Sequence, residues 1–327
     1  MKRATLAVAL TAAAIALVAL PARAYLRSRG NGGMCLWWRN PVGVPVVASF
    51  QDGPTGGGCS DPAQVSNLLR DSLATWGAAQ RPGESQPCTS FRFDYQGPVT
   101  TRAVGFDGRP GAPNENLVVF RHGICSGNPQ CTGTDLEACA DQIGCWPHDT
   151  GTSTIAITTT SYIQSTGEIV DADMELHDHS APRVGYFFTC PNLAGPSSYC
   201  GREVEPSTFG SPCVSTDVGS IFTHEAGHML GLDHPPDKPN ATMFATYEPG
   251  SVRLRVLNVD DVDGVCTVYP AGGQPLNTCS GATLPPIQQQ PKSGGGGCST
   301  ATGGVLSMMG VALAMARRAR QRQRSAG

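Results

Sequence analysis

The sequence predicts an α+β domain over residues 25–270, in which helices pack on one mixed β-sheet. Short β-rich runs and segments whose apolar residues recur at helical spacing follow the order strand, helix, further strands and then helices. The 40 glycines and 26 prolines indicate long loops between these elements. The net charge of −3 gives no indication of a nucleic-acid-binding surface, so no nucleic acid is expected as a partner.

Five runs are predicted to form the strands, because β-branched and aromatic residues gather in them. They cover residues 44–50, 91–95, 117–120, 153–159 and 169–176. A first helix is predicted over residues 63–79, after Asp61 and Pro62, which both favour a helix start. Its apolar face consists of Val65, Leu68, Leu69, Leu73 and Trp76.

Two more helices are predicted in the C-terminal half of the domain. The first begins where Ser215 or Thr216 can cap it and where Asp217 favours the positive end of the helix dipole. It runs to about Leu230. A last short helix is predicted over residues 260–267.

Residues 1–24 are interpreted as a secretory signal peptide. Lys2 and Arg3 make the start positive, an apolar run covers residues 4–20, and an Ala-x-Ala pattern ends at Ala24. The alternative is a transmembrane anchor, but the run is short for one and a cleavage pattern follows it. We therefore expect the chain to be exported.

The cysteine content agrees with an exported chain. Twelve of the 13 cysteines lie between Cys35 and Cys279, and Cys298 stands apart in a glycine tract. An even number in an exported chain predicts up to six disulfides that staple the loops, although the pairing cannot be deduced. A structural zinc cluster of cysteines is the alternative, and the lack of a C-x-x-C pair argues against it.

Residues 271–297 form a Pro-, Gly- and Gln-rich linker, and residues 298–327 form a tail of three parts. In the tail a Gly-Cys sequence at Cys298 precedes an apolar stretch, residues 304–316, and a cluster of arginines. This order resembles the myxobacterial type of C-terminal sorting signal. The resemblance implies processing near Cys298, transient membrane contact, and export or attachment at the cell surface. The alternative is a frayed amphipathic end.

The residues with the clearest chemistry lie at the end of the second predicted helix. His224 and His228 are four apart, so a helix presents both rings on one face. Gly231 allows a sharp turn that brings His234 round as a third ligand. Three imidazoles with an open fourth position are typical of a catalytic zinc site, with one Zn2+ per chain. Glu225 is placed to take a proton from the water that the zinc activates.

A bare H-E-x-x-H sequence also arises by chance, but the longer pattern H-E-x-x-H-x-x-G-x-x-H is complete over residues 224–234. This pattern resembles that of metzincin peptidases, in which a methionine turn lies beneath the zinc, and Met243 matches that methionine. The resemblance implies a zincin/metzincin catalytic domain of the α+β class. Such a domain has a twisted, mixed five-stranded sheet packed with an active-site helix and two further helices, here with disulfide-stapled loops.

Among metzincins the chain is most similar to the matrixin (matrix-metalloprotease-like) family. Residues 243–247, Met-Phe-Ala-Thr-Tyr, resemble the family's Met-Tyr-Pro-x-Tyr, which implies a substrate-pocket role for Tyr247. Residues 257–265, which contain an Asp-Asp pair, resemble the family's terminal helix. Two departures are Pro235 after the third histidine and Ala245 in place of the pocket proline, so the preferred substrate side chain is left open.

Several other residues are weaker candidates. Cys35 could block the zinc, but the even cysteine count favours a disulfide. Asp171 and Asp173 could bind Ca2+, and a solvated strand face is the favoured alternative. Asn240 begins a glycosylation sequon by pattern only. A second, structural zinc is not expected, because the spacing of the remaining histidines and their acidic neighbours does not match the family's. These residues are His148, Asp149, His177, Asp178 and His179.

The sequence therefore predicts a secreted or surface-attached zinc-dependent endopeptidase, acting as a monomer on extracellular proteins or peptides with Glu225 as general base. The substrate is expected to add as an edge strand to the strand that precedes the active helix, residues 169–176. Two alternatives remain, a zinc-stabilised surface binding or adhesion module without turnover and a zinc hydrolase of non-peptide substrates. Glu225 argues against the first, because a binding module has no need of a base.

Overall fold

The structure is a computed structural model, and it describes residues 25–54, 59, 61–110, 112, 114–148, 154–178, 185–191, 198–199, 213–279 and 297–301. The predicted signal peptide, most of the predicted linker and nearly all of the predicted tail lie outside these residues. Within the described part of the chain, no helix has the length and apolar character needed to cross a membrane.

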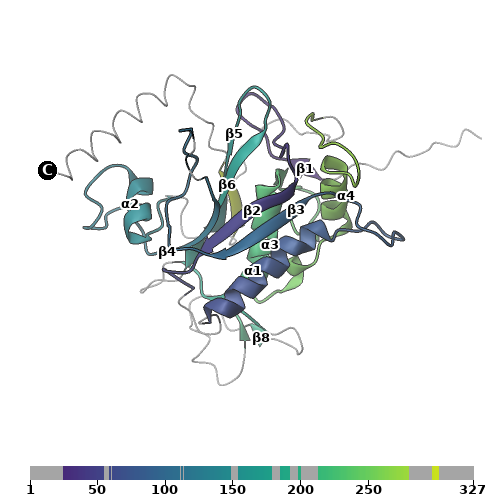
Figure 1. Ribbon diagram of the computed structural model, residues 1–327. Helices are drawn as coiled ribbons and strands as arrows, with labels where there is room; N and C mark the ends of the chain where they lie inside the picture. Colours follow the sequence, from purple (N-terminus) through teal and green to yellow (C-terminus); the bar gives the residue numbers. More distant parts are fainter. Residues whose placement is uncertain are drawn as a thin grey trace, which may run out of the picture.

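One mixed sheet forms the centre of the domain (Figure 1). Its strands, in spatial order, are β12 (Gly297–Ala301), β5 (Thr154–Tyr162), β6 (Ile169–Asp178), β4 (Asn116–His122), β2 (Val42–Ser49) and β3 (Arg92–Pro98). The β5–β6 pair is antiparallel and the other pairs are parallel. The α+β class and the five strands of the domain are confirmed, whereas β12, at the start of the predicted tail, is a further strand.

This strand order corrects the expected substrate edge. The last long strand before α3 (Val218–Met229) is β6, and it pairs with β5 on one side and with β4 on the other. A strand with two neighbours has no row of unpaired backbone groups to offer. β5 pairs with β6 on one side only, so the other edge of β5 can accept a further strand. In the structure β12 pairs with that edge.

Two helices, α1 (Pro62–Gly77) and α3 (Val218–Met229), lie side by side on one face of the sheet (Figure 1). α1 begins as the sequence predicts, with Asp61 as its cap, and most of its predicted apolar face is buried. The Trp76 ring N–H of α1 donates to the Thr223 carbonyl of α3 at 2.8 Å. The buried face of α1 therefore helps to fix the position of α3.

The cap of α3 differs from the predicted one. Asp217, rather than Ser215 or Thr216, caps the helix, and its carboxylate accepts a hydrogen bond from Ser220 N at 2.8 Å. A carboxylate accepts more strongly than a hydroxyl and also favours the helix dipole. The Arg255 guanidinium pairs with the same carboxylate and balances its buried charge.

Two further helices flank the sheet. α4 (Val259–Val268) is the predicted last helix, and it begins with a capping box between Asn258 and Asp261. No helix was expected at α2 (Leu136–Ile143). Its apolar residues Leu136, Cys139, Ala140 and Ile143 do recur at helical spacing and pack together, but its 8 residues are too short a run for a clear periodic signal. The shorter elements are β1 (Leu26–Arg27), β7 (Phe188–Thr189), β8 (Ser198–Tyr199), β9 (Cys213–Val214), β10 (Thr216–Asp217), β11 (Leu232–Asp233) and a 3-10 turn (Arg253–Arg255).

The predicted disulfide framework is confirmed among the described cysteines. Their bridges are Cys35–Cys279, Cys59–Cys190, Cys88–Cys266, Cys125–Cys145 and Cys131–Cys139. Cys213 is disulfide-bonded as well. Cys35 is therefore a structural cysteine, as the even count indicated, and not a block on the metal.

The two ends of the domain meet beside the predicted metal ligands. β1 pairs antiparallel with β11, directly before His234. The buried Arg27 guanidinium donates to the carbonyls of Leu276 and Thr278 at 2.9 and 2.7 Å. The first part of the predicted linker thus packs on the domain.

The alternating acidic residues of β6 are buried, which corrects the expected solvated strand face. Asp171 and Asp173 are each 1% exposed. Asp173 accepts backbone hydrogen bonds from Leu117 and Gly105 and shares a further hydrogen bond with Asp171. Burial raises the pKa of Asp171 to about 6 and the pKa of Asp173 well above its usual value, so the folded pair binds protons at a higher pH than free carboxyl groups do.

We expect the free energy of unfolding to fall as the pH rises from about 4 to about 6, because the folded pair keeps protons that the unfolded chain loses in this window. Asp171→Asn keeps a donor for Asp173 and does not titrate. This variant should show a flatter pH dependence and exceed the wild type in stability at pH 8 by on the order of 2 kcal/mol. Urea unfolding at several pH values measures both effects.

Asp71→Asn, which changes an exposed carboxyl group of α1, is the matched control and should leave the pH dependence unchanged. The shared proton would be refuted by equal pH profiles of wild type and Asp171→Asn. Calcium that stabilises the wild type at pH 8, but not Asp171→Asn, would instead assign the pair to a cation.

Candidate metal centre

α3 and the turn that follows it bring three histidine rings together. His224 and His228 lie one helical turn apart on α3, and His234 follows β11. The Nε2 atom of His224 lies 3.2 Å from that of His228 and 3.1 Å from that of His234, and the third distance is 2.9 Å. The structure therefore gathers the three predicted ligands at one point.

Backbone carbonyls determine which nitrogen of the two helical rings is protonated. His224 Nδ1 lies 2.6 Å from the Thr242 carbonyl oxygen, and His228 Nδ1 lies 2.9 Å from that of Leu232. A carbonyl can only accept, so each Nδ1 donates its proton and each Nε2 keeps a lone pair. Lone pairs this close repel one another, and a cation between them removes the repulsion. Nitrogens around a tetrahedral zinc lie about 3.3 Å apart, so this donor set fits zinc.

Burial keeps these rings neutral. It lowers the pKa of His224 to about 3 and the pKa of His234 to about 4. The pKa of His228 lies well below its usual value because of burial and the two neighbouring rings. Neutral imidazole is the form that binds a metal, so at neutral pH no proton has to leave before the metal enters.

Two glycines shape the centre. Gly231 has a φ of +93°, and a Cβ there would lie 2.7 Å from the Leu36 carbonyl oxygen, so the turn toward His234 requires glycine. A Cβ at Gly227 would lie 2.1 Å from Met243 Sδ. The methionine of the predicted turn thus packs against α3 at a residue between the two helical ligands.

An acidic residue of α4 fixes the turn around Met243. Asp261 accepts backbone hydrogen bonds from Thr242 at 2.7 Å, from Met243 at 3.0 Å and from Asn258 at 2.8 Å. Because the Thr242 carbonyl accepts the His224 ring N–H, Asp261 positions the ring of a predicted metal ligand through this turn. The sequence shows Asp261 only within an Asp-Asp pair, and its position three residues after a helix cap is the one local signal of this role.

The predicted base, Glu225, is buried on the same helix as two of the ligands. Its carboxylate Oε2 lies 2.7 Å from the Thr158 hydroxyl oxygen on β5. Sequence reasoning missed Thr158, because 67 positions separate the two residues and no local pattern links them. A carboxylate beside a cluster of metal-ligating rings can accept and return a proton.

Tyr247 supports the start of α3. Its hydroxyl accepts a hydrogen bond from Asp217 N at 2.9 Å and donates one to the Ser251 carbonyl at 2.7 Å. The ring is buried. These contacts tie the chain after the predicted methionine turn to the cap of α3. The role of Tyr247 in a substrate pocket stays a prediction.

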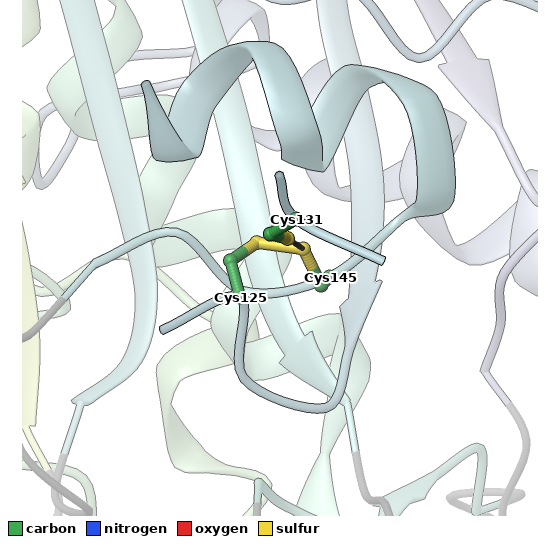
Figure 2. A group of neighbouring side chains, drawn as sticks. All are labelled: Cys125, Cys131 and Cys145. Carbon is green, nitrogen blue, oxygen red and sulfur yellow. Dashed lines mark hydrogen bonds between the residues drawn. A yellow bond between two sulfur atoms is a disulfide. The ribbon is translucent and has the colours of Figure 1, made fainter. Parts of the chain in front are cut away.

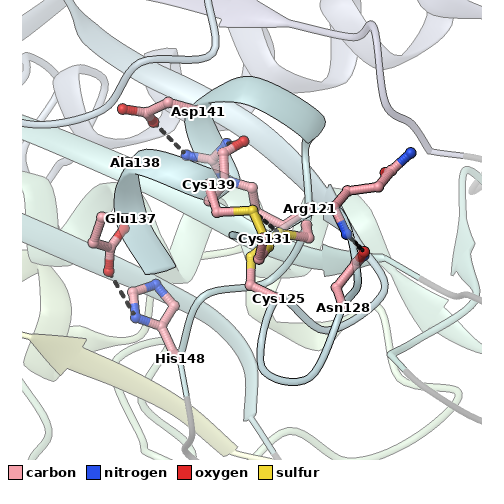
Figure 3. Close-up of a disulfide and its surroundings, with 12 residues drawn as sticks. Arg121, Cys125, Asn128, Cys131, Glu137, Ala138, Cys139, Asp141 and His148 are labelled. Atoms are coloured by element: carbon pink, nitrogen blue, oxygen red, sulfur yellow. Dashed lines mark hydrogen bonds and ion pairs between the residues drawn. A yellow bond between two sulfur atoms is a disulfide. The ribbon is translucent and has the colours of Figure 1, made fainter. Parts of the chain in front are cut away.

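A second group of titratable residues lies between α2 and β6, and Figure 3 shows two of its members, Glu137 and His148, side by side. Glu175 lies 2.9 Å from His148 Nε2 and 2.5 Å from Arg121 Nε, and Glu137 lies 3.6 Å from His148 Nδ1. Burial alone would raise the pKa of Glu175, but His148 and Arg121 outweigh burial and lower it. Because Arg121 already balances the buried carboxylate, these residues form an ion-pair network. The expectation of no second zinc stays a prediction.

The remaining histidine candidates have other surroundings. His177 stacks on the Trp146 ring, with the ring centroids 4.4 Å apart, and so contributes to packing. Its neighbour Asp178 is buried, 3.9 Å from a ring nitrogen of His122. The two other candidates, Asp149 and His179, lie outside the described residues.

Three cysteine sulfurs also gather beneath α2, those of Cys125, Cys131 and Cys145 (Figure 2). They belong to two neighbouring disulfides, in which Cys125 bonds Cys145 and Cys131 bonds Cys139. A metal site would need thiolates, and a bonded sulfur is not one. The cluster is therefore a staple for the segment around α2.

Residues 149–270 match the family model described as Matrixin (Peptidase_M10). Among curated relatives, Metalloendoproteinase 4-MMP of Arabidopsis thaliana is 45% identical over 56 residues, 17% of this chain and 16% of the relative. Matrilysin of Homo sapiens is 45% identical over 47 residues, 14% of this chain and 17% of the relative. Macrophage metalloelastase of Oryctolagus cuniculus is 32% identical over 88 residues, 26% of this chain and 18% of the relative. The chain thus spans less than a fifth of the length of these relatives, and the segment matched by the family model contains the three histidines, Glu225 and Met243.

Asp261→Asn is expected to lower the free energy of unfolding by about 1–3 kcal/mol, because an amide nitrogen cannot accept a backbone hydrogen bond. The affinity for zinc should also fall by about 10- to 100-fold, since the Thr242 carbonyl loses its fixed position. Urea unfolding and a competition titration against a zinc-binding dye measure the two effects.

Asp263→Asn is the matched control on the same helix, because Asp263 is half exposed and lies 3.4 Å from Arg81. This variant should change the stability by less than about 1 kcal/mol and leave the zinc affinity unchanged. If Asp261→Asn behaves like this control, Asp261 does not position the ligand.

Proposed function

We propose that the protein is a zinc metalloendopeptidase that hydrolyses peptide bonds in extracellular proteins or peptides. The main support is the convergence of three neutral imidazole nitrogens, two of them on buried rings of the helix that also contains the buried Glu225. The matrixin match of this segment and its similarity to metalloendoproteinases support a hydrolase of this class.

His224, His228 and His234 would hold the metal through their Nε2 atoms. A zinc bound there would polarise the peptide carbonyl and lower the pKa of water. The Glu225 carboxylate would take the proton of the attacking water and later deliver it to the leaving amine. The carbonyls of Thr242 and Leu232 keep the rings of the two helical ligands oriented throughout.

The substrate would bind as an extended strand along the outer edge of β5. β12 supports this proposal, because its pairing with β5 demonstrates that the edge fits an added strand. In that pairing Thr300 lies opposite Thr158, whose hydroxyl contacts the proposed base. A peptide on this edge would therefore pass beside Glu225.

We also propose that the protein acts outside the cytoplasm, either released or attached at the cell surface. The disulfides among the described cysteines support export, because such bridges persist in oxidising compartments. The signal peptide at residues 1–24 and the sorting tail at residues 298–327 belong to the same proposal.

A zinc-stabilised binding module is the second candidate, since a module of this kind could keep the three ligands without turnover. The buried Glu225 favours the peptidase, because a carboxylate held beside the ligands has no purpose in a purely structural site. A hydrolase of non-peptide substrates would keep Glu225, and cleavage of a protein substrate separates it from the peptidase.

The oxidised protein is expected to bind one zinc per chain and to cleave casein, and a chelator should abolish cleavage. Glu225→Gln should retain the zinc and lower cleavage by at least about 100-fold, because an amide cannot accept the proton. Metal analysis and a casein assay measure both effects.

Glu84→Gln, at an exposed residue, is the control and should be fully active. Zinc binding without cleavage would favour the binding module, and a folded protein without zinc would refute the metal centre.

Removal of residues 280–327 is expected to lower the KM for casein several-fold with little change in kcat, because β12 no longer competes for the edge of β5. The shortened chain keeps the Cys35–Cys279 bridge. Thr300→Pro in the full chain should have the same effect, because proline removes a strand donor. Thr302→Pro, just beyond β12, is the matched control. Equal KM values for full and shortened chains would exclude competition by β12.

A further inference from the structure

We infer that Thr158 is a positioning residue, whose hydroxyl holds the Glu225 carboxylate in place for proton transfer. The role rests on the proposed peptidase function, since it concerns the base of that reaction. The contact itself joins β5, the proposed substrate edge, to α3, the helix with two of the ligands.

The distances decide where the hydroxyl proton goes. Thr158 Oγ1 lies 2.7 Å from Glu225 Oε2 and 3.3 Å from the Glu225 backbone carbonyl oxygen. The shorter distance is usual for an O–H···O hydrogen bond, whereas the longer one is outside the usual range. A hydroxyl has one proton to donate, and a charged acceptor binds it more strongly than a neutral one. One oxygen of the carboxylate, Oε2, is thereby fixed.

Both partners belong to rigid elements. Thr158 lies in the middle of β5, where it pairs with Met174 of β6, and its branched Cβ restricts its rotamers. Glu225 lies within α3, and both side chains are buried, so bulk water does not compete for the hydrogen bond. A glutamate side chain otherwise samples several rotamers, and the contact selects one of them before the substrate binds.

Thr160 provides a matched control in the same strand. Residues two apart in a strand point to the same face. Thr160 is 1% exposed, and its hydroxyl has no hydrogen-bond partner among the described residues. Valine has nearly the same size as threonine, so Thr158→Val and Thr160→Val each remove one buried hydroxyl and little else. Only Thr158→Val also removes a contact with Glu225.

A double-mutant cycle measures the contact without metal or catalysis. The unfolding midpoints of the chelator-treated full chain are compared for wild type, Thr158→Val, Glu225→Ala and the double variant. The double variant is expected to lose less in Tm than the sum of the two single variants, because the second change removes an interaction that is already absent. The same cycle with Thr160→Val should be additive. Additive behaviour in both cycles would overturn the inference.

Kinetics of the zinc-loaded full chain test the positioning role. Thr158→Val should lower kcat by about ten- to hundredfold, because a displaced base is no longer aligned with the water. KM and zinc content should stay unchanged. Thr158→Ser keeps the hydroxyl and should restore most of kcat, and Thr160→Val should match the wild type.

The outcomes separate this inference from the proposed function. If the wild type cleaves casein but Thr158→Val keeps its kcat, or Thr160→Val loses as much, the positioning role is overturned and the peptidase stands. If Thr158→Val does not fold, Thr158→Ala and Thr158→Ser are compared instead. Only the serine variant keeps the hydroxyl, so only that variant should be active. If the wild type binds zinc and cleaves nothing, the peptidase proposal fails, and the positioning role fails with it.

Discussion

The close approach of three neutral imidazole nitrogens is the interaction on which the centre of this molecule depends. Their Nε2 atoms lie 2.9–3.2 Å apart, and the lone pairs of His224 and His228, at 3.2 Å, repel unless a cation lies between them. The protein holds the rings there with contacts that do not involve the metal. Backbone carbonyls accept the two helical Nδ1–H groups, and the positive φ of Gly231 turns the chain toward His234.

These contacts in turn depend on elements far from α3 in the sequence. Asp261 of α4 holds the turn whose Thr242 carbonyl orients His224. Arg255 balances the carboxylate that caps α3, and β1 pairs with the segment before the third ligand. Each of these contacts fixes one backbone group or one charge near α3. The geometry of the centre therefore depends on how α1, α4 and the chain ends pack around α3. A loss in any of them would misplace a ligand without touching it.

The parts of this arrangement that the sequence predicts are those set by local periodicity. The three predicted ligands lie within residues 224–234, so helical spacing and one glycine suffice to place them. Contacts between residues far apart in the sequence cannot be predicted in this way, and the hydrogen bond between Thr158 and Glu225 is an example. The strands that pair with β6 could not be predicted for the same reason, because strand order in a sheet depends on pairing between distant segments. The burial of Asp171 was missed because alternation alone does not reveal what covers a strand face.

The position of β5 links substrate binding to proton transfer in the proposed reaction. Its outer edge is where a strand can add, and its inner face presents the Thr158 hydroxyl to Glu225. An extended peptide bound to that edge would stiffen β5, because each added backbone hydrogen bond restrains the strand. The restraint would pass to the base through a single side chain, with no movement of α3. Substrate binding and alignment of the base would then depend on the same strand, so a peptide that pairs poorly with β5 would be both weakly held and slowly cleaved.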